Sequence, residues 1–313
     1  MMTEDAAAPV RASYIGGADI AALIGASPYS SALDVYARKI GAIPEQDETP
    51  AMEWGKRLEP VVAQKYADDE RVALRKGIWT RGPKPFLGGT PDYEIEGARR
   101  GLEVKTAGLV TRGPDLSLWG EDGSDEVPEQ YLAQCAWYME ITGYARWDLA
   151  AFVGGRGYAQ FRVKRDPELG AALMETADRF WTDHVLKRVP PAPDASESAR
   201  EALGSLWPRN TRPLLRATPE VEQIADECRE ACAAFDVAEE RKREAENRLR
   251  AVIADAEGIE GIGWRVTWRH NKPAERLDVE ALRATPEGAT LCAQFMRPAP
   301  GARVLRKNWN TNP

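Results

Sequence analysis

Three charged residues in segment 88–108 have the types and spacing that could hold a metal ion. Glu103 and Lys105 lie two apart in a predicted strand, so their side chains emerge on one face. Asp92 lies on the preceding strand of the same predicted hairpin and can sit beside Glu103. Two carboxylates with a main-chain carbonyl between them suit Mg²⁺, which takes oxygen ligands and retains several waters. A lysine there could orient a water or stabilise charge on a phosphoryl oxygen.

The same residues have a plainer interpretation. Asp92, Glu103 and Lys105 could form an ion pair on the solvent face of a hairpin, which would add little to stability. Glu94 and Glu96 of this hairpin are interpreted as surface residues, because they share the face of Asp92 only if that strand stays regular. The hairpin alone therefore leaves both interpretations open.

Two predicted helices bring further polar side chains toward the hairpin. The helix expected over 50–70 places Glu59 beside its apolar stripe, where it would project toward the sheet. The expected stripe consists of Trp54, Leu58, Val61, Val62 and Tyr66. A later helix begins after Pro128 and carries Gln134 and Tyr138 on one face, at positions i and i+4. Both helices could complete a site at the hairpin.

The composition argues against other chemistries. The chain of 313 residues has 2 histidines, too few to favour a Ser-His or Cys-His hydrolase. Its 4 cysteines are too few and too scattered for a disulfide framework, and a zinc site on Cys228 and Cys232 would need two further good ligands. No apolar run approaches the roughly 20 residues that span a membrane, and the start does not resemble a signal peptide. We therefore expect a cytoplasmic protein without membrane contact.

A Pro-, Ala- and Ser-rich break at 188–200 predicts two domains, residues 1–195 and 196–313. In the first, helix and strand signals alternate, as in an α/β domain. The second is expected to be a mainly helical appendage with a short β element. Its apolar residues recur at heptad-like spacing over a long helix at about 216–257. That stripe fits packing on the first domain, self-association into an oligomer, or contact with a partner.

Four segments resemble motifs of the YqaJ-like viral recombinase family, which includes the phage lambda-type exonuclease. They occur along the chain in the same order as in the family. "PDYEIEGARRGLEVK" (91–105) resembles the PD-(D/E)-x-K nuclease signature. "IGGADIAALIG" (15–25) resembles the opening Gly-Gly-Ser-Asp helix of the family. "MEWGKRLEPVVAQKY" (52–66) resembles the motif with a buried glutamate, and "VPEQYLAQCAWYMEITG" (127–143) the helix that bears a glutamine. The ordered set is far more specific than the hairpin alone.

The resemblance implies a restriction-endonuclease-like α/β fold, a mixed sheet flanked by helices, and a role for each matching residue. Asp92, Glu103 and the Val104 carbonyl would bind Mg²⁺, with Mn²⁺ as the expected substitute. Lys105 would be catalytic, assisting the attacking water. Glu59 would act on the metal, through a water, or on a second metal, and Gln134 would join the active site.

A 5′ phosphate would be held by Arg11 and the main chain at Gly17 and Ala18, again by resemblance. Ala18 stands where the family has serine, so the hydroxyl contact to phosphate is lost. A helix N-terminus can still hold an anion with its free N–H groups.

The resemblance further implies Mg²⁺-dependent hydrolysis of DNA, with 5′ to 3′ exonuclease digestion of duplex ends for recombination as the leading interpretation. A structure-specific endonuclease of the same superfamily is one alternative. A DNA-end-binding scaffold without catalysis is another. The expected partners are double-stranded DNA ends, a single-strand annealing protein and further copies of the chain.

Overall fold

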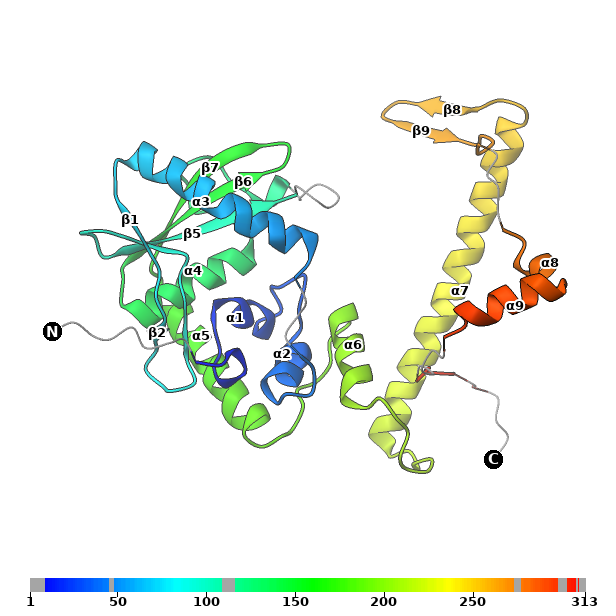
Figure 1. The fold of residues 1–313 in the computed structure, drawn as a ribbon, viewed down its shortest axis with the longest axis horizontal. Coiled ribbons are helices and arrows are strands. Elements are labelled where there is room, and N and C mark those ends of the chain that lie inside the picture. Colours follow the sequence, from blue (N-terminus) through cyan, green and yellow to red (C-terminus); the bar gives the residue numbers. More distant parts are fainter. Residues whose placement is uncertain are drawn as a thin grey trace. The chain divides into compact units, whose positions relative to one another are not determined.

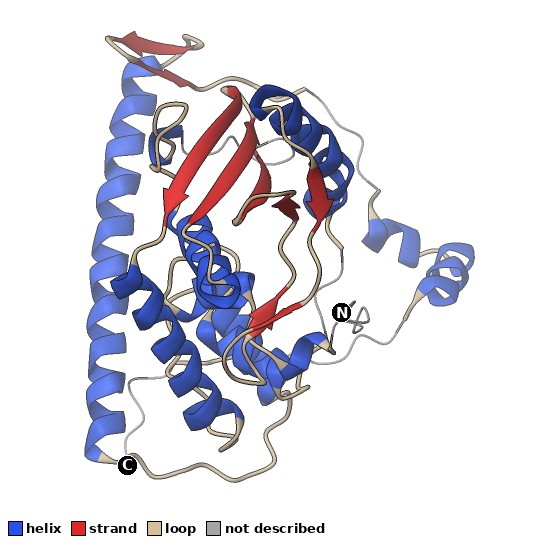
Figure 2. Cartoon of the chain, turned by 90° about the vertical axis from the view of Figure 1, so that its left-hand side faces the viewer, coloured by secondary structure: helices blue, strands red, loops and turns tan. Residues whose placement is uncertain are grey.

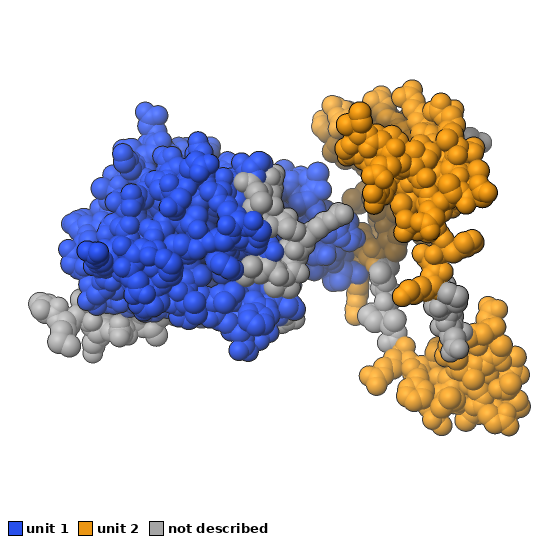
Figure 3. All heavy atoms as spheres, turned by 90° about the horizontal axis from the view of Figure 1, so that it is seen from above, with its two compact units in different colours: residues 1–208 blue, residues 209–313 orange. Residues whose placement is uncertain are grey.

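The computed structural model describes residues 9–44, 48–108, 116–272, 277–297, 303–307 and 309. The chain divides into two compact units, residues 1–208 and 209–313, shown in different colours in Figure 3. The division falls after Pro208 rather than after residue 195, because α6 (Glu197–Leu206) packs on α2 (Ala32–Lys39). Ala199 and Ala202 of α6 are buried there, and the Ser31 amide donates to Ser198 Oγ at 3.1 Å.

A five-stranded mixed sheet forms the centre of the first unit (Figures 1 and 2), in the order β1-β4-β5-β6-β7. These strands are β1 (Leu74–Lys76), β4 (Tyr93–Ile95), β5 (Arg100–Ala107), β6 (Arg146–Val153) and β7 (Gly157–Lys164). β5 and β6 are parallel, and the other neighbouring pairs are antiparallel. A parallel pair needs a crossover, which α4 (Glu129–Thr142) supplies. The expected mixed sheet flanked by helices is confirmed.

One face of this sheet packs against α3 (Pro50–Glu70). Thr49 caps the helix with Pro50 in its first turn, and the helix ends at Arg71, which is left-handed with a φ of 53°. Its buried residues are Val62, Ala63, Tyr66 and Ala67. The first three pack with Leu102, Val104 and Ile95 of the strands. The predicted stripe is wrong for Trp54 and Val61, which are 52% and 64% exposed. The buried positions lie in the second half of the helix, where two alanines take part of the stripe.

The opposite face carries the larger core, with α1 (Gly17–Leu23), α4 and α5 (Pro167–Arg179). Its largest fully buried side chains include Trp137 of α4 and Trp147 of β6. α4 follows Pro128 and ends at Gly143, which has a φ of 70°, a conformation in which glycine carries no Cβ penalty. The remaining elements of this unit are η1 (Arg11–Ser13), β2 (Thr80–Arg81), β3 (Gly88–Gly89), η2 (Leu116–Leu118) and the π-helical turn η3 (Phe180–Val185).

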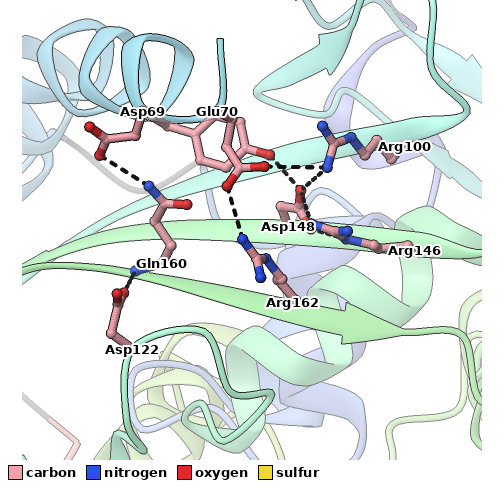
Figure 4. A network of polar contacts seen from close by, with 9 residues as sticks. Asp69, Glu70, Arg100, Asp122, Arg146, Asp148, Gln160 and Arg162 are labelled. Atoms are coloured by element: carbon pink, nitrogen blue, oxygen red, sulfur yellow. Dashed lines mark hydrogen bonds and ion pairs between the residues drawn. The ribbon is translucent and has the colours of Figure 1, made fainter. Parts of the chain in front are cut away.

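A buried aspartate, Asp148, links α3 to the strands that it covers through hydrogen bonds (Figure 4). Asp148 of β6 is fully buried and accepts hydrogen bonds from the Tyr66 hydroxyl and from Arg100 Nη1, the latter at 3.1 Å. Arg146 adds two further bonds to the same carboxylate, at 2.5 and 2.8 Å. At the end of α3, Glu70 accepts from Arg162 of β7 at 2.9 Å. A buried carboxylate requires such partners, and this one receives charged donors from two strands.

The second unit contains the long helix α7 (Pro219–Ile253), observed where the sequence predicts one at about 216–257. A two-stranded sheet of β8 (Gly258–Gly261) and β9 (Trp264–Thr267) follows, then α8 (Val279–Arg283) and α9 (Pro286–Phe295). Within this unit the heptad-like positions are largely exposed, as for Phe235 at 66%. No described helix combines the length and the apolar content that crossing a membrane requires.

Candidate active site

The hairpin of β4 and β5 brings the first two predicted metal ligands together. Tyr93 pairs with Leu102, so Asp92 lies opposite Glu103 across the antiparallel ladder. The Val104 amide donates to Asp92 Oδ2 at 2.9 Å and holds that carboxylate against β5. Glu103 has no exposed surface. The plainer interpretation, an ion pair on the solvent face, is therefore wrong for Glu103.

Lys105 joins this pair from the same strand face. Its Nζ donates to Glu103 Oε1 at 2.5 Å, and the lysine side chain is 20% exposed. The other carboxylate oxygen, Glu103 Oε2, is buried without a hydrogen-bond partner among the described residues. A buried carboxylate oxygen without a partner is costly, which makes it a good acceptor for a water or a cation.

The two acids are held in an environment that resists negative charge. Burial, followed by the charge of Asp92, raises the pKa of Glu103 to about 8, although the Lys105 ammonium opposes this. Burial also raises the pKa of Asp92, against the pull of Lys105. Burial would lower the pKa of Lys105, but the charges of Glu103 and Asp92 outweigh it and raise that pKa. The lysine therefore stays cationic, and one ammonium balances only one of two carboxylates.

This donor set fits a hard divalent cation. Asp92 and Glu103 offer carboxylate oxygens, Glu103 Oε2 lacks a partner among the described residues, and one further positive charge would offset their repulsion. No group of three or more His, Cys, Asp and Glu side chains that could hold a metal occurs in the described part of the chain. The protein ligands would be the two carboxylates and, as the family resemblance implies, the Val104 carbonyl, with water completing the shell, as Mg²⁺ allows.

Glu59 lies near this pair without joining it. Its carboxylate forms an ion pair with Lys76 of β1, and its charge contributes to the raised pKa of Glu103. Lys76 Nζ in turn lies 4.3 Å from the centre of the Tyr93 ring. Direct ligation by Glu59 is not supported by this arrangement, whereas an effect through water fits it.

Gln134 and Tyr138 contact the start of α1, and Tyr138 also reaches the hairpin. A Cβ at Gly17 would lie 2.8 Å from Gln134 Cγ and 3.3 Å from Tyr138 Cζ, so only glycine allows this approach. The Tyr138 hydroxyl donates to the Thr90 carbonyl at 3.0 Å, two residues before Asp92. Burial, then the charges of Glu103 and Asp92, raises the pKa of Tyr138 well above its usual value.

Arg11 belongs to an ion cluster at the N-terminus of α1. Its Nη1 lies 2.6 Å from Asp19 Oδ2, which also accepts from the Gly16 amide at 2.9 Å and pairs with Lys39 at 2.9 Å. Burial would raise the pKa of Asp19, but Arg11 and Lys39 outweigh it and lower that pKa. The Gly16 N–H, one donor that an anion at this helix end could have used, is therefore already bonded to Asp19. Gly17 is buried and Ala18 is exposed.

Several residues around the site were not predicted from the sequence. Asp19 could have been found from its place three residues after the N-cap Gly16, a capping position. Tyr131 of α4, whose ring faces Lys105 at 5.2 Å, carries no comparable signal. Glu94 was interpreted as hairpin surface, but it is buried, accepting from Arg75 at 2.8 Å and from the Tyr144 hydroxyl at 3.1 Å. Its partners come from distant segments, which the strand pattern does not reveal.

The first unit is similar to a known domain family. Residues 8–145 match the model of the YqaJ-like viral recombinase domain, which confirms the resemblance drawn from the motifs. The "Uncharacterized protein YqaJ" of Bacillus subtilis (strain 168) is 28% identical over 198 residues. That match covers 62% of this chain and 60% of the relative's length.

Two solved structures are also similar. One is an alkaline exonuclease, LHK-Exo, from Laribacter hongkongensis, with a TM-score of 0.46 and 16% identity; the match covers 57% of this chain and 91% of that one. The other is a phage-related exonuclease from Haemophilus somnus 129PT, with a TM-score of 0.43 and 13% identity over 56% of this chain and 96% of that one.

Proposed function

We propose that the first unit is a Mg²⁺-dependent nuclease that hydrolyses phosphodiester bonds of DNA, acting 5′ to 3′ on duplex ends. The observation that carries the proposal is the group of Asp92, Glu103 and Lys105, with Glu103 Oε2 buried and unpartnered among the described residues. The family match and the exonuclease relatives are consistent with this chemistry.

Each residue of the candidate site would have a role that fits its chemistry. Asp92, Glu103 and the Val104 carbonyl would hold Mg²⁺, or Mn²⁺ in its place, and the ion would neutralise the scissile phosphate and acidify a water. Lys105 stays cationic beside Glu103 and can orient that water or stabilise charge on a phosphate oxygen. Gln134 would contribute to the active-site wall, and Glu59 would act through water.

The 5′ phosphate of the DNA would be bound near the N-terminus of α1. Arg11 pairs with Asp19 through Nη1, and its side chain is one-third exposed, so a phosphate could approach its guanidinium from solvent. Because the Gly16 amide is bonded to Asp19, Gly17 and Ala18 would supply the main-chain contact. With alanine in the serine position, a 5′ phosphate should be preferred only weakly.

One assay tests this function against its alternatives. Linear and covalently closed duplex DNA are incubated with Mg²⁺ or EDTA, with wild type beside Lys105→Ala. We expect progressive, Mg²⁺-dependent loss of linear DNA by wild type and none by the variant. Cutting of closed circles would favour a structure-specific endonuclease instead. Binding of DNA ends without any cutting by wild type would favour a scaffold.

For the second unit we propose a role in assembly. The exposed heptad-like positions of α7 suit a second copy of the chain, and an annealing protein is the alternative partner. Light scattering of the full chain should give a mass above the 34.6 kDa of one copy. A monomeric mass would contradict self-association.

A further inference from the structure

The Lys105 ammonium is enclosed on two sides. Glu103 Oε1 accepts from Nζ at 2.5 Å, and the centre of the Tyr131 ring lies 5.2 Å from the same nitrogen. The ring centre is within the roughly 6 Å over which an aromatic face attracts a cation, and that attraction strengthens when the cation is shielded from water. Lys105 meets that condition, because its side chain is 20% exposed.

Tyr131 is itself fixed by its neighbours. Trp119, which is buried, packs on the Tyr131 ring with centres 5.6 Å apart and on Phe161 at 5.5 Å. The Trp119 carbonyl accepts from Arg156 Nη1 at 2.7 Å, which anchors this part of the loop to the β6–β7 turn. The ring that faces Lys105 is therefore held from behind, by a loop that leads into α4.

The contact with Lys105 is made by the face of the Tyr131 ring, over which Nζ lies. A ring face constrains where an ammonium lies without accepting its proton. The carboxylate on one side and the ring on the other therefore restrict the amine to a narrow range of positions.

We infer that Tyr131 is a positioning residue for Lys105, acting through its ring face, and that Trp119 holds that ring in place. The inference goes beyond the metal ligands and the lysine. The expected effect of Tyr131 on kcat rests on the proposed nuclease function. Its effect on the position of the Lys105 amine can be measured without any enzymatic activity.

The first test reads the position of the amine directly. Full-length wild type, Tyr131→Phe and Tyr131→Leu are trace-labelled with acetic anhydride, and acetylation at each lysine is quantified by mass spectrometry. We expect Tyr131→Leu to raise labelling of Lys105 by about fivefold or more, because the amine loses its cover, and Tyr131→Phe to stay within about twofold of wild type. Unchanged labelling in Tyr131→Leu would overturn the inference, and so would equal effects of the two substitutions.

A matched control lies on the other face of the sheet. Lys65 Nζ lies 5.2 Å from the Tyr158 ring centre, the same separation, but the Lys65 side chain is 55% exposed. Tyr158→Leu should therefore change labelling of Lys65 little and leave Lys105 unchanged. A rise at Lys105 in this variant would mean that general loosening explains the result. If Tyr131→Leu does not fold, as judged by its thermal transition, Tyr131→Met serves as the aliphatic variant.

The second test uses linear duplex DNA with Mg²⁺. Tyr131→Leu should lose about tenfold or more in kcat with KM within about twofold, because the lysine is misplaced rather than the DNA. Tyr131→Phe should keep a kcat close to that of wild type. A normal kcat in Tyr131→Leu would overturn the positioning role. Complete inactivity of wild type would instead contradict the nuclease function and leave the labelling result standing.

Discussion

The main-chain N–H of Val104, within β5, donates to Oδ2 of Asp92, the residue that precedes β4, at 2.9 Å. Because the donor belongs to the main chain, no side-chain substitution at residue 104 removes it short of proline. The bond directs the Asp92 carboxylate toward Glu103, the residue opposite it in the ladder. It also places both candidate metal-binding acids on one short, rigid hairpin.

Asp92→Asn should therefore weaken metal binding without unfolding the hairpin. The amide oxygen of asparagine can still accept from Val104, but the negative charge is gone. We expect the affinity for Mn²⁺, measured by calorimetry, to fall by about tenfold or more, since a hard cation depends on carboxylate charge. Glu94→Gln is the matched control, because Glu94 is a buried acid of the same hairpin that pairs with Arg75. Equal losses in both variants would contradict the assignment.

Metal binding should tighten with rising pH. The pKa of Glu103 is raised to about 8, so below that pH the carboxyl carries a proton that a metal must displace. Between pH 6 and 8 the affinity should increase by up to about tenfold per pH unit, and should level off above that range. In Asp92→Asn the midpoint should move to lower pH, because the Asp92 charge is one cause of the shift. A pH-independent affinity in wild type would contradict this account of the site.

Gly17→Ala should damage both stability and activity. The new Cβ would lie 2.8 Å from Gln134 Cγ, so the glutamine must move away from its place on α4. We expect a loss of about 1–3 kcal/mol in the free energy of unfolding, measured with urea, together with a lower kcat. Gly204→Ala in α6 is the control: nothing lies within 4 Å of its added Cβ, and alanine should stabilise that helix by about 0.5–1 kcal/mol. A neutral Gly17→Ala would show that the contact is not tight.

Asp148→Asn should destabilise the first unit strongly. Asp148 is fully buried between Tyr66, Arg100 and Arg146, and removing its charge leaves two arginines without their buried partner. We expect a loss of about 3–5 kcal/mol in the free energy of unfolding. Asp69→Asn, at an exposed acid that pairs with Lys65, should cost no more than about 1 kcal/mol. Similar costs for both substitutions would contradict the structural role of the buried acid.

The candidate site could be predicted as far as local geometry determines it. Strand alternation alone places Glu103 and Lys105 on one face, and a short hairpin places Asp92 opposite Glu103. The partners of Glu59, Glu94 and Asp148 could not be predicted, because they depend on which distant strand or helix lies alongside. Periodicity on its own cannot supply that information.

The same limit applies to the fold. The alternation of helices and strands in the first unit follows from apolar patterns and turn residues, whereas the parallel pairing of β5 with β6 does not. The predicted buried stripe of α3 was wrong at Trp54 and Val61, which are exposed. The sheet covers the second half of the helix, and alanines can fill buried positions there. The division of the chain falls after Pro208 because α6 has a partner in α2, a contact that the Pro-rich segment before it conceals.

The central claim is that Glu103, between Asp92 and Lys105, holds the ion that cuts DNA. Its most direct test is the initial rate of nucleotide release from linear duplex DNA with Mg²⁺, for wild type, Glu103→Gln and Glu94→Gln. Glutamine keeps the shape of glutamate and removes its charge. The predicted result is release by wild type and Glu94→Gln, and a fall of about a thousandfold or more in Glu103→Gln. Release by Glu103→Gln at the wild-type rate would contradict the assignment.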